Sequence, residues 1–234
     1  MTSTNTIEAA PTLGYGDLPH LISLMTGDAK HSAAANSTLD VVWVLYDRVL
    51  RVSPETVDDP GRDRFYLSKG HGPMAYYATL AAKGFLPVSW LADWASWGSP
   101  LGHHPDRVLV PGVEISSGSL GHGLPLAVGT ALGIRAQGLA SRVVVLVGDA
   151  ELDEGSNHEA VELAGAMGLE QLTVVVVDNE SSTWNRPGRI GGRFATEGWY
   201  VVAVDGRDHT QLERALSRRV AGRPTVVIAE VEAR

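Results

Sequence analysis

Four short apolar runs, separated by longer amphipathic segments, give the second half of the chain a regular pattern. Runs of this length that are rich in β-branched residues are typical of strands buried on both faces. Helical patterns at 156–167 and 208–220 lie between them. This alternation predicts an α/β fold, with a parallel sheet, right-handed crossovers and helices on both faces. The predicted strands are residues 143–147, 173–177, 200–204 and 225–229.

The first half of the chain has a helical pattern interrupted by long loops. A helix is expected from about residue 39, with Ser37 or Thr38 as its cap, and it ends near Pro54. Glycine, proline and polar residues mark the loops. The other elements expected outside the strand region are a loop at 55–64 leading into the segment 66–72, helices at 73–83 and 122–137, a loop at 97–120 and a connector at 186–193.

Three tryptophans, Trp90, Trp94 and Trp97, have the spacing of one helix face. Cofactor stacking is one interpretation of such a row. Packing is the simpler one, because large aromatic rings at helical spacing most often face a core. We therefore expect these side chains in the core or in a subunit contact.

Composition narrows the chemistry that the chain can perform. Its 234 residues, 44% of them apolar, suffice for one sizeable core, so we expect a flexible segment at 1–17 and a single domain at 18–234. A net charge of -8 without a basic run argues against nucleic acid or an anionic membrane as partner. The polar start lacks the apolar run of a signal peptide, which indicates a cytoplasmic protein. The absence of cysteine excludes thiolate chemistry, so oxygen or imidazole must hold any metal, which favours magnesium.

Oxygen-bearing side chains follow two successive predicted strands. Gly148, Asp149 and Ala150 come after the first strand, and Asn179 comes after the second. Ligands of such sheets lie beyond the carboxyl ends of the strands, and Asp149 and Asn179 are able to share one magnesium ion there. Gly148 would allow a diphosphate close to the backbone. An aspartate after a strand also commonly turns the chain or caps a helix.

Four ordered segments together resemble the transketolase family. The similarity covers roughly residues 18–232, and the ordered series is more specific than one short signature. The segments are Gly-Asp-Ala-Glu-Leu-Asp-Glu-Gly at 148–155 followed by the Asp-Asn pair at 178–179, Leu-Ser-Lys-Gly-His-Gly at 67–72, Leu-Gly-His-His-Pro-Asp at 101–106, and the glycine-rich run at 112–124.

The resemblance implies a site for thiamine diphosphate and a divalent metal, Mg²⁺ or else Ca²⁺ or Mn²⁺. It assigns the metal to Asp149, to Asn179 and to the backbone carbonyl of Ser181. The implied cofactor-binding residues are His71, Ser119, Leu120, Gly121, Gly148, Asp149, Ala150 and Asn179. The implied catalytic residues are His31, His71, His104 and Glu154.

The implied chemistry explains these residue types. Thiamine diphosphate supplies a carbon nucleophile and an electron sink, so the protein must anchor it, orient it and manage protons. Imidazoles suit proton transfer because they titrate near neutrality, which makes His71 and His104 the acid–base candidates. His31 rests on a weaker match. Glu154 and Glu159 match glutamates that connect two active sites across a dimer interface. For His20 and His209 we expect structural roles.

The sequence also departs from the family pattern. Ala150 replaces a glycine, and the segment after Asn179 lacks the usual glycine and aspartate. A loop histidine and the domain with the glutamate that activates the cofactor's aminopyrimidine are not found in this sequence. We therefore expect a partner subunit with the pyrimidine-binding domain, in a heterodimer or heterotetramer.

The leading functional hypothesis is transfer of a two-carbon ketol unit from a ketose donor to an aldehyde or aldose acceptor, with a small-molecule sugar as substrate. One alternative is a 2-oxo-acid decarboxylating or acyloin-forming enzyme, because Glu-Leu-Asp-Glu at 151–154 also resembles some 2-oxo-acid dehydrogenases. A scaffold subunit that has lost its chemistry is a second alternative.

Overall fold

A computed structural model describes residues 13–27, 29–184 and 186–232. Five parallel strands form one sheet in the order β1-β2-β3-β5-β4. The strands are β1 (Arg64–Leu67), β2 (Val143–Gly148), β3 (Leu172–Asp178), β4 (Tyr200–Asp205) and β5 (Thr225–Glu230). The α-helices are α1 (Leu18–Ser23), α2 (Ala29–Val44), α3 (Pro73–Ala82), α4 (Gly123–Ala136), α5 (Gly155–Ala166), α6 (Arg189–Thr196) and α7 (His209–Leu216). Short helical turns complete the described elements: η1 (Tyr15–Asp17), η2 (Leu45–Val49), η3 (Pro54–Thr56), η4 (Val88–Asp93) and η5 (Ala150–Asp153).

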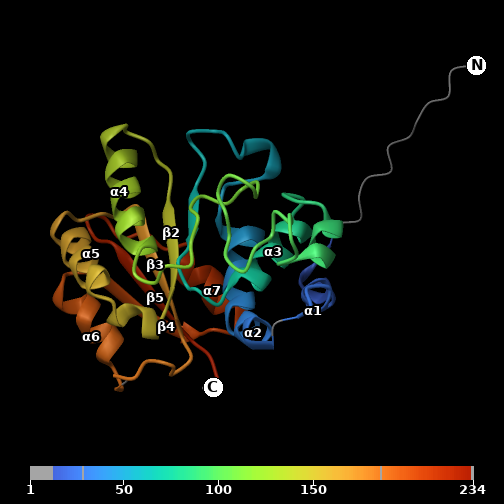
Figure 1. The fold of residues 1–234 in the computed structure, drawn as a ribbon. Coiled ribbons are helices and arrows are strands. Elements are labelled where there is room, and N and C mark those ends of the chain that lie inside the picture. Colours follow the sequence, from blue (N-terminus) through green and yellow to red (C-terminus); the bar gives the residue numbers. More distant parts are fainter. Residues whose placement is uncertain (1–12, 28, 185, 233–234) are drawn as a thin grey trace, which may run out of the picture.

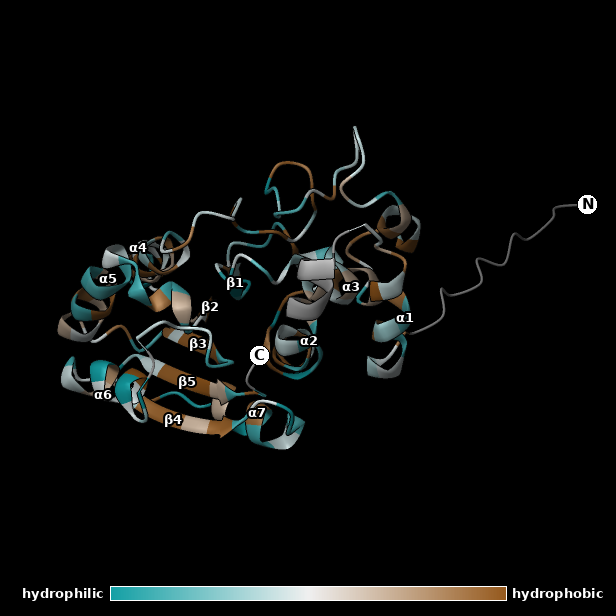
Figure 2. Ribbon diagram, turned by 60° about the horizontal axis from the view of Figure 1, so that its bottom comes forward, coloured by the Kyte–Doolittle hydropathy of each residue, from teal (hydrophilic) through white to brown (hydrophobic). Residues whose placement is uncertain are grey.

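Helices cover both faces of the sheet, as the alternating pattern predicts (Figure 1). Along β2, Val144 and Leu146 belong to the buried cluster that includes residues of α1, α2, α3 and α7, while Val143 and Val145 belong to the cluster that includes residues of α4, α5 and α6. Strand β2 is apolar throughout and β3 is apolar between Thr173 and Asp178, and both lie between helices whose outer sides are hydrophilic (Figure 2). Successive side chains of a strand point to opposite faces, so a strand buried on both sides needs no polar position. The predicted α/β fold with helices on both faces is confirmed.

Several predicted boundaries in the first half are wrong. The helix expected near residue 39 is α2, which begins at Ala29, so Ser37 and Thr38 lie inside it and do not cap it. Alanine-rich residues before Ser37 favour helix and extend it toward the amino terminus. Strand β1 was not predicted, because its four residues give no usable period.

Two further differences concern the second half. The expected connector at 186–193 includes the start of α6, whose first residue Arg189 is bound to Asp153 by an ion pair of 2.8 Å. Helix α7 ends at Leu216, before the expected end at Val220. The expected flexible segment at 1–17 lies mainly outside the described residues. Its described end forms η1, where the Tyr15 hydroxyl donates to Asp40 at 2.6 Å.

The three tryptophans do not share a helix face. Their region forms the 3₁₀ turn η4, and Ala95 has a φ of 56° just after it, which turns the chain. Trp94 is buried and donates its indole N–H to the carbonyl of Gly102 at 3.2 Å, whereas Trp97 is fully exposed. Packing in the core is therefore confirmed for Trp94, and Trp90 packs half-buried against the core. Trp97 lies outside the core, and a subunit contact for it stays a prediction.

None of the helices that the structure describes combines the length and the apolar character needed to cross a lipid bilayer.

Candidate active site

Two buried polar side chains mark the carboxyl edge of the sheet. Strands β2 and β3 are paired in parallel with Gly148 opposite Val177, so Asp149 and Asn179 leave the sheet at the same edge. Their side chains are nearly inaccessible, with residue exposures of 1% and 2%. The sequence prediction that these two residues come together at one edge is thus matched by the strand register.

The loop after β3 holds the Asp149 carboxylate. The Ser181 hydroxyl donates to Oδ1 at 2.5 Å, and the Ser182 amide donates to Oδ2 at 2.9 Å. The Ser182 hydroxyl in turn donates to Asp153 at 2.8 Å, and Asp153 pairs with Arg189. These contacts fix the direction of the carboxylate. Each carboxylate oxygen keeps a further lone pair for another partner.

Asn179 carries an unsatisfied acceptor. Its Oδ1 is buried and accepts no hydrogen bond from any residue that the structure describes. A buried carbonyl oxygen without a donor costs about 1–3 kcal/mol, so such a group needs a partner, either a water molecule or a bound ion. A hard cation beside Asp149 would satisfy it, because Mg²⁺ prefers carboxylate and amide oxygens and completes its shell with phosphate oxygens and water. The residues present therefore fit a divalent metal with a diphosphate.

The described residues contain no group of three or more histidine, cysteine, aspartate or glutamate side chains arranged to hold a metal. The donor set here has a single carboxylate, an amide and the predicted Ser181 carbonyl. These protein groups carry only one negative charge, so the site suits a divalent cation that binds together with an anionic ligand.

A cavity of about 270 Å³ opens at this edge. It brings together residues from the loops after β1, β2 and β3 and from the glycine-rich loop before α4. Its lining residues are Lys69, Gly70, His71, His104, Gly118, Leu120, Gly148, Ala150, Glu151, Asn179 and Ser181. Six of the residues implied by the resemblance to transketolases as cofactor-binding or metal-binding, namely His71, Leu120, Gly148, Ala150, Asn179 and Ser181, share this wall.

The two imidazoles of the cavity are exposed on its loop side. His71 follows β1, and His104 lies in the loop before α4. Gly118 has a φ of +121°, and a Cβ atom there would come within 2.7 Å of Cγ of His104. Only glycine allows this close approach. The glycine thus makes room for the ring at the cavity wall.

Other predicted site residues do not line the cavity. Asp149 is one of them: it lies buried between the lining residues Gly148 and Ala150. Glu154 is exposed and precedes α5, and Ser119 lies outside the lining although its neighbours belong to it. Gly121 is buried behind the wall, where its carbonyl accepts the Ser156 hydroxyl at 2.8 Å. His31 belongs to α2, but its side chain lies outside the described part of the structure.

Two charged residues of the cavity were missed as site residues by the sequence reasoning. Lys69 is buried, and its ammonium donates to the hydroxyls of Ser37 and Thr38 at 3.2 and 3.0 Å. Glu151 is buried as well. Burial raises the pKa of its carboxyl, and hydrogen bonds from Ser68 and the amides of Gly121 and Gly148 oppose this shift only in part. Both residues stand inside the family-like motifs, and that position was the available signal.

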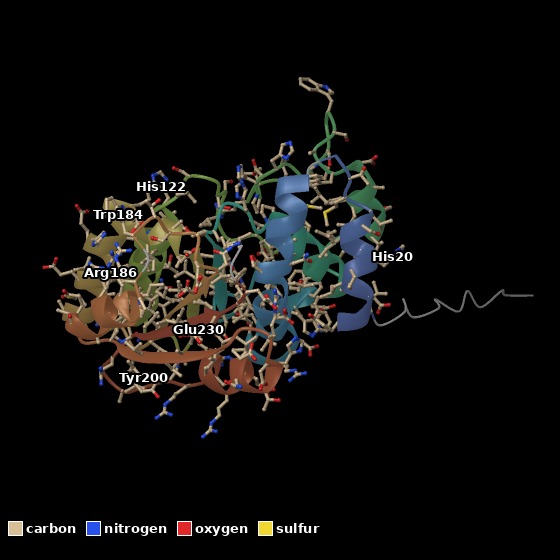
Figure 3. All side chains as sticks on the ribbon, turned by 90° about the horizontal axis from the view of Figure 1, so that it is seen from below. His20, His122, Trp184, Arg186, Tyr200 and Glu230 are labelled. Atoms are coloured by element: carbon tan, nitrogen blue, oxygen red, sulfur yellow. The ribbon has the colours of Figure 1, made fainter. Side chains whose placement is uncertain are left out.

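The side chains that follow the Ser181 loop lie far from those on α1. Trp184 and Arg186, which follow the loop of Ser181, lie on the opposite side of the molecule from His20 (Figure 3). His20 is exposed on α1, in keeping with the expectation that it has no part in the site. His209 instead contacts the Asp40 carboxylate at 2.7 Å, within a cluster that includes Tyr15.

The fold and the cavity define an α/β protein with a binding site at the carboxyl ends of its parallel strands. Residues 23–231 match the thiamine diphosphate binding domain of transketolase. The chain therefore belongs to the transketolase family and carries its cofactor-binding domain. The relatives that define this family are thiamine-diphosphate-dependent transferases.

Three similar proteins illustrate the relation. The chain is 56% identical over 229 residues to a Rhodococcoides fascians protein named "Ferredoxin fas2", with 97% of this chain and 75% of that protein covered. It is 41% identical over 145 residues to one subunit of the apulose-4-phosphate transketolase of Actinobacillus succinogenes, covering 62% of this chain and 52% of that protein. The transketolase of Leishmania mexicana has the same fold, with a TM-score of 0.78 at 24% identity, over 94% of this chain and 37% of that structure.

The lengths and names of these proteins bear on the chain in different ways. The chain spans about half of the Actinobacillus protein and little more than a third of the Leishmania transketolase. The name ferredoxin belongs to the Rhodococcoides protein. Iron–sulfur clusters are held by cysteine thiolates, and this chain has no cysteine. Its own residues therefore supply no thiolate for such a cluster.

Proposed function

We propose that this chain is the cofactor-binding subunit of a split transketolase, which transfers a two-carbon ketol unit from a ketose to an aldehyde or aldose. The orphaned Oδ1 of Asn179, buried beside Asp149 on the cavity wall, is the observation that carries the proposal. In this proposal Asp149, Asn179 and the Ser181 carbonyl hold Mg²⁺, and Gly148 and Ala150 border the diphosphate.

His71 and His104 are proposed to move protons to and from the substrate oxygens. Their position on the exposed side of the cavity supports this role, because a sugar substrate must enter from that side. General acid–base catalysis by a positioned imidazole contributes about 10²–10⁴-fold to a rate. His31 is proposed to join them from α2.

A partner subunit with the pyrimidine-binding domain is proposed to complete the site, in a heterodimer or heterotetramer. The Actinobacillus relative, which is named as one subunit of a transketolase, supports this organisation. The exposed Leu120 on the cavity wall also supports it, because an apolar side chain at the mouth of a polar cavity gains from being covered. Glu154 and Glu159, exposed near α5, are proposed to lie at the contact between cofactor-binding subunits. Residues 18–234 are proposed to act as one domain.

The test is reconstitution with the partner, thiamine diphosphate and Mg²⁺. We expect calorimetry to detect metal-dependent cofactor binding and a ketose phosphate to be consumed with an aldose acceptor. Release of carbon dioxide from pyruvate, without ketol transfer, would support a 2-oxo-acid enzyme instead. Absence of cofactor binding in the intact complex would leave a scaffold subunit.

Two variants test the assignment of the metal to Asn179. Asn179→Ala is expected to weaken cofactor binding, because it removes the orphaned acceptor. Gln171→Ala is the matched control: its buried Oε1 likewise accepts no hydrogen bond within the described part of the chain, but Gln171 precedes β3 at the opposite edge of the sheet. Equal losses of cofactor affinity in both variants would contradict the metal assignment.

A further inference from the structure

A buried carboxylate joins the segments that frame the cavity. Glu151 is 2% exposed and lies on the cavity wall. Its Oε1 accepts from the Ser68 hydroxyl and, at 3.0 Å, from the Gly121 amide. Its Oε2 accepts from the Gly148 amide at 3.2 Å. One side chain thus contacts the loop after β1, the loop before α4 and the end of β2.

The Ser68 hydroxyl extends this network to a helix. It accepts from the amide of Gly123, the first residue of α4, at 3.0 Å while it donates to Glu151. Amide groups in the first turn of a helix have no partner within the helix. Glu151 therefore acts through Ser68 on the start of α4 as well as directly on the loop that precedes it.

The loop before α4 has little freedom to take another position. Gly121 has a φ of +84°, and a Cβ atom there would lie 2.6 Å from the Ser156 hydroxyl. A Cβ atom on Gly123 would lie 2.3 Å from Cβ of Ser68. Backbone approaches this close require glycine and hold only while the facing groups stay in place. The Glu151 carboxylate accepts the hydrogen bonds of Ser68 and Gly121 in this tightly packed loop.

The backbone of Glu151 is fixed from the other side. Its carbonyl accepts from the Asn157 side-chain amide at 2.7 Å and from the Glu154 amide at 3.1 Å. Both donors belong to the start of α5 or its cap. The carboxylate is therefore presented from a rigid base, which is the arrangement that a positioning group needs.

We propose that Glu151 is a positioning residue of the cofactor cavity: its carboxylate fixes the loop 118–123 and the Gly148 amide in the places where they form the wall. The inference rests on the proposed function, which supplies the cofactor. It also implies that the Gly148 amide does not donate a hydrogen bond to the diphosphate. Since the Gly148 amide already binds Glu151, this glycine serves the diphosphate by lacking a side chain. With both oxygens engaged by donors, Glu151 is given no proton-transfer step.

Two readouts test the proposal on the full chain with its partner. The first is hydrogen exchange of the amides at 118–123 without cofactor, and the second is the dissociation constant of thiamine diphosphate with Mg²⁺. For Glu151→Gln we expect exchange of the Gly121 and Gly123 amides to accelerate about tenfold or more, because the charge-assisted acceptor is lost. Cofactor affinity should fall about tenfold for the same reason.

Matched variants keep the result interpretable. Glu162→Gln, an exposed position on α5 to which no role is assigned, should change neither readout. Ser68→Ala leaves the carboxylate in place and should accelerate exchange at Gly123 more than at Gly121. Glu151→Asp keeps the charge on a shorter side chain and should recover part of the cofactor affinity lost in Glu151→Gln.

Unchanged exchange at 118–123 in Glu151→Gln overturns the proposal, whatever the cofactor does. Accelerated exchange together with wild-type cofactor affinity also overturns it, because the loop would then be ordered for stability alone. If the wild-type complex itself fails to bind thiamine diphosphate, the proposed function fails, and the exchange experiment still decides whether Glu151 fixes the wall.

Discussion

An aspartate is buried at each end of the parallel strands, at the amino ends (the amino edge of the sheet) and at the carboxyl ends (the carboxyl edge), and the two sites are built differently. At the amino edge, Asp63 precedes β1 and is 1% exposed; it accepts from the amides of Arg51 and Arg142 at 3.0 and 2.8 Å and pairs with the Arg51 guanidinium. At the carboxyl edge, Asp149 is equally buried but is held by the Ser181 hydroxyl and the Ser182 amide beside an unsatisfied amide oxygen.

Burial of a carboxylate therefore does not by itself indicate function. The amino-edge group has a cationic partner and closes the start of two strands, which is a structural role. The carboxyl-edge group is held by neutral donors and leaves the sheet at the same end as Asn179, which lines the cavity and carries the orphaned acceptor. A buried carboxylate held in this way is the one prepared to receive a cation. Substitutions at the two edges should consequently affect different measurements.

The largest expected effect is on cofactor binding at the carboxyl edge. Asp149→Asn removes the only carboxylate of the proposed metal set, so the affinity for thiamine diphosphate with Mg²⁺ should fall on the order of 10²–10³-fold. Calorimetry of the complex measures this loss. Thermal unfolding without cofactor measures the separate loss of stability, because the variant also loses the charge that accepts from the Ser181 hydroxyl and the Ser182 amide.

Asp205→Asn is the matched control for this substitution. Asp205 also ends a parallel strand at the carboxyl edge, but it is exposed and accepts from the Arg207 amide at 2.8 Å. Its replacement should leave cofactor affinity within about twofold of the wild type. A comparable loss in both variants would remove the contrast between the site and an ordinary strand end.

The second expected effect is on stability at the amino edge. Asp63→Asn removes the charge that accepts two backbone amides, so the free energy of unfolding should fall by about 2 kcal/mol. The exposed position of Arg51 limits the share of the ion pair itself. Urea unfolding measures this change. Cofactor affinity of the folded fraction should stay at the wild-type value, and a large drop in affinity would contradict the structural role of this edge.

The sequence predicted the carboxyl edge better than the amino edge for a physical reason. Apolar β-branched runs locate β2 and β3, and their register then brings Asp149 and Asn179 together without further information. Asp63 carried no signal, because its partners are the amides of Arg51 and Arg142, far apart in the chain. Contacts of that kind are set by tertiary packing, which no local pattern encodes.

The cavity wall shows the same limit. His71 and His104 were found through their motifs, whereas Glu151 lies in a motif that suggested no role for it. Its significance depends on donors from two distant loops, which only the structure brings together. The extent of α2 was missed because alanine-rich residues before Ser37 have no hydrophobic period, although they favour helix.

A third, smaller effect concerns the loop side of the carboxyl edge. Gly118→Ala introduces a Cβ atom that would lie 2.7 Å from the His104 ring at a φ of +121°, so the ring must move. Ketol transfer should fall on the order of tenfold while cofactor affinity remains nearly unchanged. Steady-state kinetics and calorimetry separate the two quantities.

Gly138→Ala serves as the control for backbone strain. Gly138 also has a positive φ, of +67°, but a Cβ atom there would meet nothing within 4 Å. This variant should lose a little stability and no activity. Equal losses of activity in the two variants would show that strain, and not the displaced imidazole, lowers the rate.

The smallest expected effect is the pH dependence of the stability that Asp63 and Glu151 contribute at the two ends of the sheet. Burial raises the pKa of Asp63, but hydrogen bonds from the Arg51 side chain and from the amides of Arg51 and Arg142 outweigh it, so the pKa lies below its ordinary value of 3.8. The stability that Asp63 contributes is present above that ordinary value and is lost as the pH falls through the lowered pKa. Glu151 has the opposite sign, because its raised pKa gives stability that is present below its ordinary value of 4.5 and is lost as the pH rises.

The loss of folding stability at low pH should therefore come from protonation of Asp63 at the amino edge. In urea unfolding, the difference between wild type and Asp63→Asn should be constant from about pH 7 to pH 5 and shrink toward about pH 3, because protonation removes from the wild type the charge that the variant already lacks. A difference that stays constant down to about pH 3 would mean that the Asp63 charge adds nothing to the fold and that only its shape as an acceptor matters.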